Sequence, residues 1–218
     1  QRGKLSLLTL GTYQKDDPGC ACYHGMLGAW CLTANHILDK QGDYVNIDAT
    51  AGIDNIATPL FHAYDVNFFA VEPTLKGVQV FLDFDDVAQK HGMRVPVVLN
   101  KITSEEDADF IKAHIPEDRI VATIYKSKYM KRFDQGQEDA LYHIIEENRE
   151  AFDAIKAYVD ATPKDWGRYY SKMVEAHNKF AKSWHNDFHK VDLTVPENNN
   201  FKYEDVLNRA TGNQRTAY

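Results

Sequence analysis

The stretch that decides the fold is DVNFFAVEPTLKGVQVFLDFDDVAQKHGMRVPVVLNKI, residues 65–102. Its two ends, DVNFFAVE (65–72) and MRVPVVLNK (93–101), are short apolar runs and read as buried strands. The segment between them, 74–92, has apolar residues at helical spacing and ends at Gly92, a common helix stop. A strand, a helix and a strand in this order predict two parallel strands joined by a right-handed crossover.

The same alternation continues on both sides of this stretch. Towards the C-terminus, SEEDADFIKAHI (104–115) predicts a helix with a Ser104-x-x-Asp107 cap, and DRIVATIY (118–125) predicts a strand. Towards the N-terminus, the patterns predict two strands, at 5–11 and 43–49, and two helices, at 24–40 and 53–63. Strands alternating with helices predict an α/β fold, with a mostly parallel sheet covered by helices on both faces.

The pattern changes after Gly136. Two segments with apolar residues along one face, 138–161 and 165–189, flank Pro163. They predict a helical hairpin that packs on the sheet domain or on a partner. We therefore divide the chain into an α/β domain of the nucleotide-binding type at 1–136 and a helical C-terminal extension at 137–218.

The composition restricts the class of protein. The chain has 218 residues, of which 44% are hydrophobic, enough for one large domain or a domain with an appendage. A formal net charge of −7 gives no general attraction to nucleic acid, and the basic run KSKYMKR (126–132) is interpreted as a solvated loop. No run is long and apolar enough to span a membrane. Three cysteines favour a reducing compartment, so we expect a cytoplasmic protein.

Polar residues follow two of the predicted strands, at the place where such sheets bind ligands. Asp48 could orient Mg²⁺, and Gly52 would let the backbone approach a γ-phosphate. The alternative is that Asp48 caps the next helix. Asn100 could pair with a purine edge while the stem of Lys101 packs on the ring. For Asn100 and Lys101 alone, a simple turn is the favoured interpretation.

Taken together, three stretches resemble one family of ATPases: GCAC (19–22), IDATAGIDNIATPLFHAYDVNFFAVEPT (47–74) and VVLNKI (97–102). They resemble the Min/partitioning (SIMIBI) branch of deviant P-loop ATPases. The closest resemblance is to the accessory ATPases that help insert nickel into carbon monoxide dehydrogenase. The resemblance covers roughly residues 4–125. Asp54 departs mildly from the family's usual Glu, and Thr74 from its usual Ser.

The resemblance implies a role for each candidate residue. Asp48 and Gly52 would be catalytic residues of the second nucleotide switch. Asn100 and Lys101 would bind the adenine of ATP or ADP, whose phosphates are bound with Mg²⁺. The phosphate-binding loop Gly-x-x-x-x-Gly-Lys-Ser/Thr does not occur in these residues, and in the family it precedes the cysteine loop. We expect that the native protein is longer, that its phosphate site has been lost, or that another chain supplies it.

Without that loop, the 218-residue chain alone is not expected to hydrolyse ATP by the family mechanism.

Cys20 and Cys22 are the candidate metal ligands. Two thiolates one residue apart cannot give zinc or nickel four ligands, but two copies of the pair could. The resemblance implies such a Cys₄ site, joining a homodimer. A redox pair and two incidental loop cysteines are the alternatives. Weaker metal candidates are His177, His185 and His189, for which a polar helix face is favoured, and His24, which lies beside the cysteine pair.

Two classes of function stay open. The first is the C-terminal part of an ATP-binding metallocentre-maturation protein, a homodimer whose client would be a metalloenzyme resembling carbon monoxide dehydrogenase. The second is a non-catalytic α/β scaffold or binding subunit that has lost nucleotide hydrolysis. For the first class we predict that Asp48, Glu72 and Asn100 lie at one edge of the parallel sheet, because each ends an apolar strand.

Overall fold

A computed structural model describes residues 6–9, 42–49, 55, 59–165, 167–169, 171, 172 and 175. The chain divides into two compact units. One comprises 1–48, 58–63 and 165–218, and it contains the 3-10 helix η2 (Pro59–His62). The other, which we call the sheet unit, comprises 49–57 and 64–164. All the geometry that follows belongs to the sheet unit unless stated otherwise.

Three parallel strands form the centre of the sheet unit. They are β1 (Phe69–Val71), β2 (Val97–Ile102) and β3 (Ile120–Tyr125), in the order β1-β2-β3. Helix α2 (Leu75–Lys90) connects the first two strands, and α3 (Glu105–Lys112) connects the second and third. The strand-helix-strand interpretation of residues 65–102 is therefore confirmed, and so is the α/β class.

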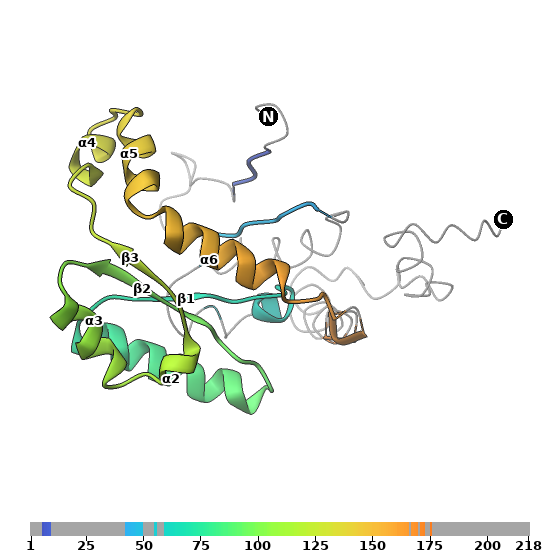
Figure 1. The fold of residues 1–218 in the computed structure, drawn as a ribbon. Helices are drawn as coiled ribbons and strands as arrows, with labels where there is room; N and C mark the ends of the chain where they lie inside the picture. Colours follow the sequence, from blue (N-terminus) through green and yellow to red (C-terminus); the bar gives the residue numbers. More distant parts are fainter. Residues whose placement is uncertain are drawn as a thin grey trace, which may run out of the picture. The chain divides into compact units, whose positions relative to one another are not determined.

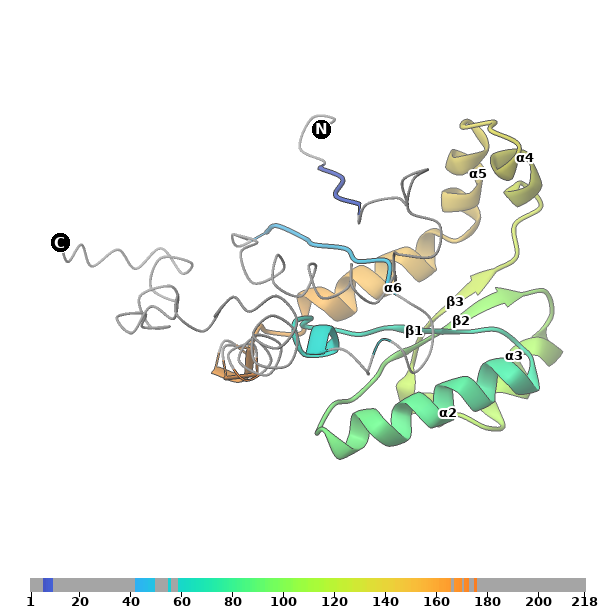
Figure 2. The same cartoon turned by 180° about the vertical axis from the view of Figure 1, so that it is seen from behind.

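Helices cover both faces of this sheet, as Figures 1 and 2 show. Helices α2 and α3 lie on one face, and α6 (Arg149–Asp160) lies on the other, mainly against β3. The core on the α2 side is built from apolar side chains that are almost fully buried, each worth about 1.5–3 kcal/mol of transfer free energy: Val71, Val78, Phe81, Phe84, Val95, Val97, Leu99, Ile102, Ile111 and Ile115. On the α6 side, Phe68 packs edge-on against Tyr158.

Side-chain caps fix where α2 and α3 begin. The Thr74 hydroxyl accepts a hydrogen bond from the Gly77 N–H at 3.0 Å, and Ser104 accepts one from the Asp107 N–H at 3.4 Å. The carboxylate of Asp107 accepts a return bond from the Thr103 N–H at 2.8 Å, so the predicted cap at Ser104 is confirmed. Helix α2 ends before Gly92, whose φ of +70° suits glycine.

The chain after β3 differs from the predicted pattern. Helix η3 (Glu117–Arg119) precedes β3, and α4 (Met130–Asp134) follows it. The single helix predicted at 138–161 is wrong, because the structure divides this segment into α5 (Ala140–Glu147) and α6. The break is at Asn148, whose buried side chain bonds to the backbone of β3. Both α5 and α6 belong to the sheet unit, and the domain division at residue 136 stays a prediction.

Two predicted strands are wrong where the structure describes them. Residues 6–9 and 42–49 contain no strand. The prediction assumed buried apolar runs, but Leu7, Leu8, Tyr44 and Val45 are all at least half exposed. An apolar run becomes a strand only where a neighbouring strand pairs with it. The predicted helix at 24–40 lies outside the described residues.

Candidate functional site

Charged and polar side chains gather where the three strands end. Because the strands are parallel, their carboxyl ends meet at one edge of the sheet. Lys101 in β2 donates from Nζ to Oε1 of Glu72, the residue after β1, at 2.6 Å. Glu72 and Asn100 therefore lie at the same edge, as predicted. Asp48 belongs to the other unit, so its position relative to this edge stays a prediction.

The Asn100-Lys101 pair forms an irregularity in β2. The register between β2 and β3 shifts between Leu99 and Ile102, and Lys101 has a φ of +57°. The Asn100 carbonyl Oδ1 accepts a hydrogen bond from the Lys101 N–H at 3.0 Å. A lysine in the left-handed region costs about 1–2 kcal/mol, and such conformations cluster at functional sites. The pair therefore forms an irregular position within β2, and its role in binding stays a prediction.

The start of α2 packs closely on the end of β1. A Cβ added to Gly77 would lie 2.7 Å from the Glu72 carbonyl oxygen and 3.1 Å from the Thr74 hydroxyl. Real Cβ atoms essentially never approach backbone that closely, so a side chain at this position would push the helix away. The close packing holds the Glu72 backbone at the edge.

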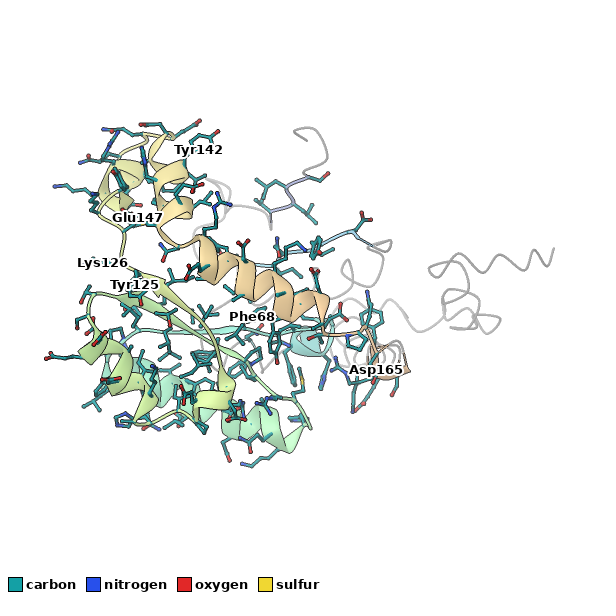
Figure 3. The ribbon with its side chains drawn as sticks, in the orientation of Figure 1. Phe68, Tyr125, Lys126, Tyr142, Glu147 and Asp165 are labelled. Carbon is teal, nitrogen blue, oxygen red and sulfur yellow. The ribbon has the colours of Figure 1, made fainter. Side chains whose placement is uncertain are left out.

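The end of β3 is held by Asn148, which the sequence analysis missed. Its side-chain Oδ1 accepts from the Tyr125 N–H at 2.7 Å, and its Nδ2 donates to the Tyr125 carbonyl at 3.3 Å and the Ile144 carbonyl at 3.2 Å. Figure 3 labels Tyr125 at this end of β3. The one signal in the sequence is an asparagine inside a predicted helix, where asparagine is unfavourable. These bonds fix the end of β3. Just beyond that end, the Lys126 N–H donates to the carbonyl of Ile102 in β2, which is the strand that contains Asn100 and Lys101.

One carboxylate close to this edge has a shifted pKa. Hydrogen bonds from the side chain and then the backbone of Thr103 lower the pKa of Asp107 below its usual value. The stability that the ionised Asp107 contributes at the start of α3 is therefore fully present above the usual pKa of an aspartate. That contribution is lost as the pH falls through the lowered pKa.

The remaining candidates cannot be placed. Gly52, Cys20, Cys22 and the histidines at 24, 177, 185 and 189 lie outside the described residues. Within the part that is described, no three His, Cys, Asp or Glu side chains are grouped so that they could hold a metal ion. Among the helices of that same part, none is long and apolar enough to cross a membrane.

Comparison with known proteins gives two relatives, both from Methanocaldococcus jannaschii and both named uncharacterized ATP-binding protein. One is 26% identical over 128 residues, which cover 59% of this chain and 50% of that protein. The other is 27% identical over 117 residues, which cover 53% of this chain and 44% of that protein. This chain is similar to ATP-binding proteins.

The chain spans about half the length of these two relatives. No protein-family model matches it. The relatives support the ATP-binding part of the predicted resemblance, and the Min/partitioning branch and nickel insertion stay proposals.

The backbone at Lys101 gives a test of strain at the edge. We expect Lys101→Gly to have a free energy of unfolding about 1 kcal/mol higher than Lys101→Ala, because only glycine adopts a positive φ without cost. Both variants lose the ion pair with Glu72, so the difference reports the backbone alone. Urea unfolding measures it, and equal stabilities of the two variants would show that Lys101 is not strained.

Proposed function

We propose that the carboxyl edge of the sheet unit binds the base of ATP, and that the chain is part of an ATP-binding protein. The observation that carries the proposal is the bulge at Asn100 and Lys101, which presents a side-chain amide and an ammonium group at this edge. The names of the two relatives support the choice of ATP as ligand.

The bonding of Asn100 leaves it able to recognise a purine. Its Oδ1 is held by the Lys101 N–H, and within the described residues its Nδ2 donates to no atom. A side-chain amide has two donors and a carbonyl with two lone pairs, so Asn100 can still donate to a ring nitrogen and accept from an exocyclic amine. The ion pair with Glu72 holds the Lys101 ammonium group at this edge. The apolar stem of Lys101 can then pack on the adenine ring.

Nucleotide titration of the 218-residue chain tests this proposal. We expect ATP and adenosine to bind with similar affinities in the millimolar range, about −4 kcal/mol, because the sequence contains no phosphate-binding loop. NMR spectra should show shifts of the Asn100 side-chain amide and the Lys101 N–H. Asn100→Asp keeps the acceptor for the Lys101 N–H and removes the donor, so it should abolish the shift of the Lys101 N–H on addition of nucleotide.

Gln79→Ala on the exposed side of α2 is the matched control and should leave the shifts unchanged. Micromolar binding of ATP but not adenosine would reveal a phosphate site that the sequence analysis missed. Shifts that avoid Asn100 and Lys101 would contradict the proposed base site.

We further propose, from the resemblance alone, that the protein matures a metallocentre and that Cys20 and Cys22 bind nickel or zinc between two copies. The two thiols are close in sequence, and a second copy would complete four ligands. A client metalloenzyme would then receive the metal. The resemblance also implies that Asp48 and Gly52 are catalytic residues of the second nucleotide switch.

Metal analysis of the purified protein tests the cysteine proposal. We expect about one divalent metal per dimer, and loss of that metal in Cys20→Ser/Cys22→Ser, because a closed tetrahedral site needs all four thiolates. Cys31→Ser is the control, since Cys31 is the one cysteine of the chain outside the Cys20–Cys22 pair. Unchanged metal content in the double variant would direct attention to the histidines of the C-terminal segment.

A further inference from the structure

The ion pair between Lys101 and Glu72 joins the ends of two neighbouring strands at the candidate base site. Lys101 Nζ lies 2.6 Å from Oε1 of Glu72, and the two side chains are 57% and 46% exposed, respectively. An exposed pair of this kind contributes little to stability. The other carboxylate oxygen of Glu72, Oε2, forms no hydrogen bond with any described residue, so it can accept one from a ligand.

The register of the sheet places Glu72 beside Asn100. Val71 and Leu99 are opposite each other in β1 and β2, and both lie in the core under α2. Successive side chains of a strand alternate between the two faces of a sheet. The side chains of Glu72 and Asn100, one residue further on, therefore lie on the other face. Neighbouring strands are about 5 Å apart, so one small ligand can contact both side chains.

The backbone of Glu72 is held in place by its own neighbours. Its carbonyl accepts a hydrogen bond from the Thr74 N–H at 2.7 Å, and a Cβ added to Gly77 would lie 2.7 Å from the same oxygen. Pro73 follows directly and restricts Glu72 to an extended conformation. Since Lys101 holds the carboxylate as well, a ligand meets an acceptor that is already ordered, which lowers the entropy cost of binding.

The position of the ion pair decides which part of a nucleotide lies beside Glu72. In the proposed base site, Asn100 bonds to the purine edge that carries the exocyclic amine, and the ring packs on the stem of Lys101, which ends at Glu72. A purine carries its sugar at the end of the ring system away from that amine, so the sugar lies beside Glu72. The ion pair is neutral as a whole, which favours an uncharged ribose at this place over a phosphate.

We propose that Glu72 binds the ribose 2′-hydroxyl, so that the site selects ribonucleotides over 2′-deoxyribonucleotides. This role of Glu72 rests on the proposed base site. The 2′-hydroxyl donates to Oε2 of Glu72. The Lys101 ammonium group has three protons and uses one for Oε1, so another can be donated to the 3′-hydroxyl oxygen. Dinucleotide-binding folds also hold a ribose 2′-hydroxyl with a carboxylate.

Titration of the 218-residue chain with AMP and with 2′-deoxy-AMP tests the proposal, because the two ligands differ in one hydroxyl group. The NMR shifts of the Asn100 side-chain amide give both affinities. We expect AMP to bind at least about fivefold more tightly, because its extra hydroxyl forms a hydrogen bond to a charged group. Glu72→Met keeps the length of the side chain but removes both acceptor oxygens, so AMP should then bind as weakly as 2′-deoxy-AMP.

Two further variants serve as controls. Lys101→Met breaks the same ion pair but keeps the carboxylate and an apolar stem, so it should keep a preference for AMP. Its comparison with Glu72→Met separates loss of the carboxylate from loss of the pair. Asp86 forms an equally short and exposed pair with Lys90 on α2, so Asp86→Met should leave both affinities unchanged. The same spectra show whether each variant is folded.

The titrations distinguish failure of the ribose contact from failure of the base site. If AMP and 2′-deoxy-AMP bind the wild type equally and both shift the Asn100 amide, the base site stands and the role of Glu72 is overturned. If neither nucleotide shifts that amide, the base site is wrong and the ribose contact falls with it. A preference for AMP that survives in Glu72→Met also overturns the proposal.

Discussion

Replacing Arg119 by Met is expected to lower the free energy of unfolding by about 3–5 kcal/mol. Arg119, at the end of η3, forms an ion pair with Asp85 on α2, and the two side chains are only 13% and 11% exposed. The Nε of Arg119 also donates to the Val95 carbonyl at 3.1 Å. The second carboxylate oxygen of Asp85 accepts from Gln89 at 2.6 Å.

The expected loss is large because methionine keeps the apolar stem but leaves the Asp85 carboxylate buried without its cation. A buried unpaired charge costs more than the pair itself contributes. Domains of this size are typically stable by about 5–15 kcal/mol, so the change is a large fraction of the total. Urea unfolding followed by circular dichroism measures it.

A surface pair on the same helix is the matched control. Lys90 and Asp86 form an ion pair at 2.6 Å, but their side chains are 68% and 66% exposed. Lys90→Met should therefore change the free energy of unfolding by less than about 1 kcal/mol. The double variant Asp85→Leu/Arg119→Met should recover much of the stability, because no buried charge remains. If Arg119→Met loses no more free energy of unfolding than Lys90→Met, the Arg119–Asp85 ion pair does not stabilise the fold as a buried pair.

Replacing Asn148 by Ala is expected to lower the free energy of unfolding by about 2–4 kcal/mol. The side chain of Asn148 is almost fully buried and bonds to three backbone groups, the N–H and carbonyl of Tyr125 and the carbonyl of Ile144. Each partly buried backbone group left without a partner costs free energy of its own. The variant should also loosen the junction between α5 and α6.

Hydrogen exchange gives a residue-specific readout of the same change. The Tyr125 amide should exchange much faster in Asn148→Ala, because its acceptor has been removed. Glu147→Ala changes an exposed neighbour and should alter stability by less than about 0.5 kcal/mol. If the Tyr125 amide exchanges at the wild-type rate in Asn148→Ala, the bond to Asn148 is not what protects it.

The local chemistry of the sequence was enough to predict most of the sheet unit. The apolar runs that became β1, β2 and β3 are short and bounded by polar residues, and α2 and α3 have apolar residues at helical spacing. Thr74 and Ser104 start those helices by bonds to residues three positions along the chain. Such features depend on neighbours within one helical turn, so a single sequence contains them.

The candidate site was predicted in part. Because parallel strands end at a common edge, the sequence places Glu72 and Asn100 together, and the structure confirms this. The positive φ of Lys101 was not predictable, since lysine has no preference for that conformation. It arises from the register shift between β2 and β3, which exists only when the two strands are paired.

The sequence by itself therefore determined the order and type of the main strands and helices around residues 65–125, the cap at Ser104 and the common edge at which Glu72 and Asn100 lie. Only the tertiary structure decided that Asn148 interrupts a helix to hold β3 and that Arg119 reaches Asp85 across 34 positions. The physical reason is distance along the chain. Helical periodicity and caps arise between residues a few positions apart, whereas these contacts exist only after packing has brought separate elements together.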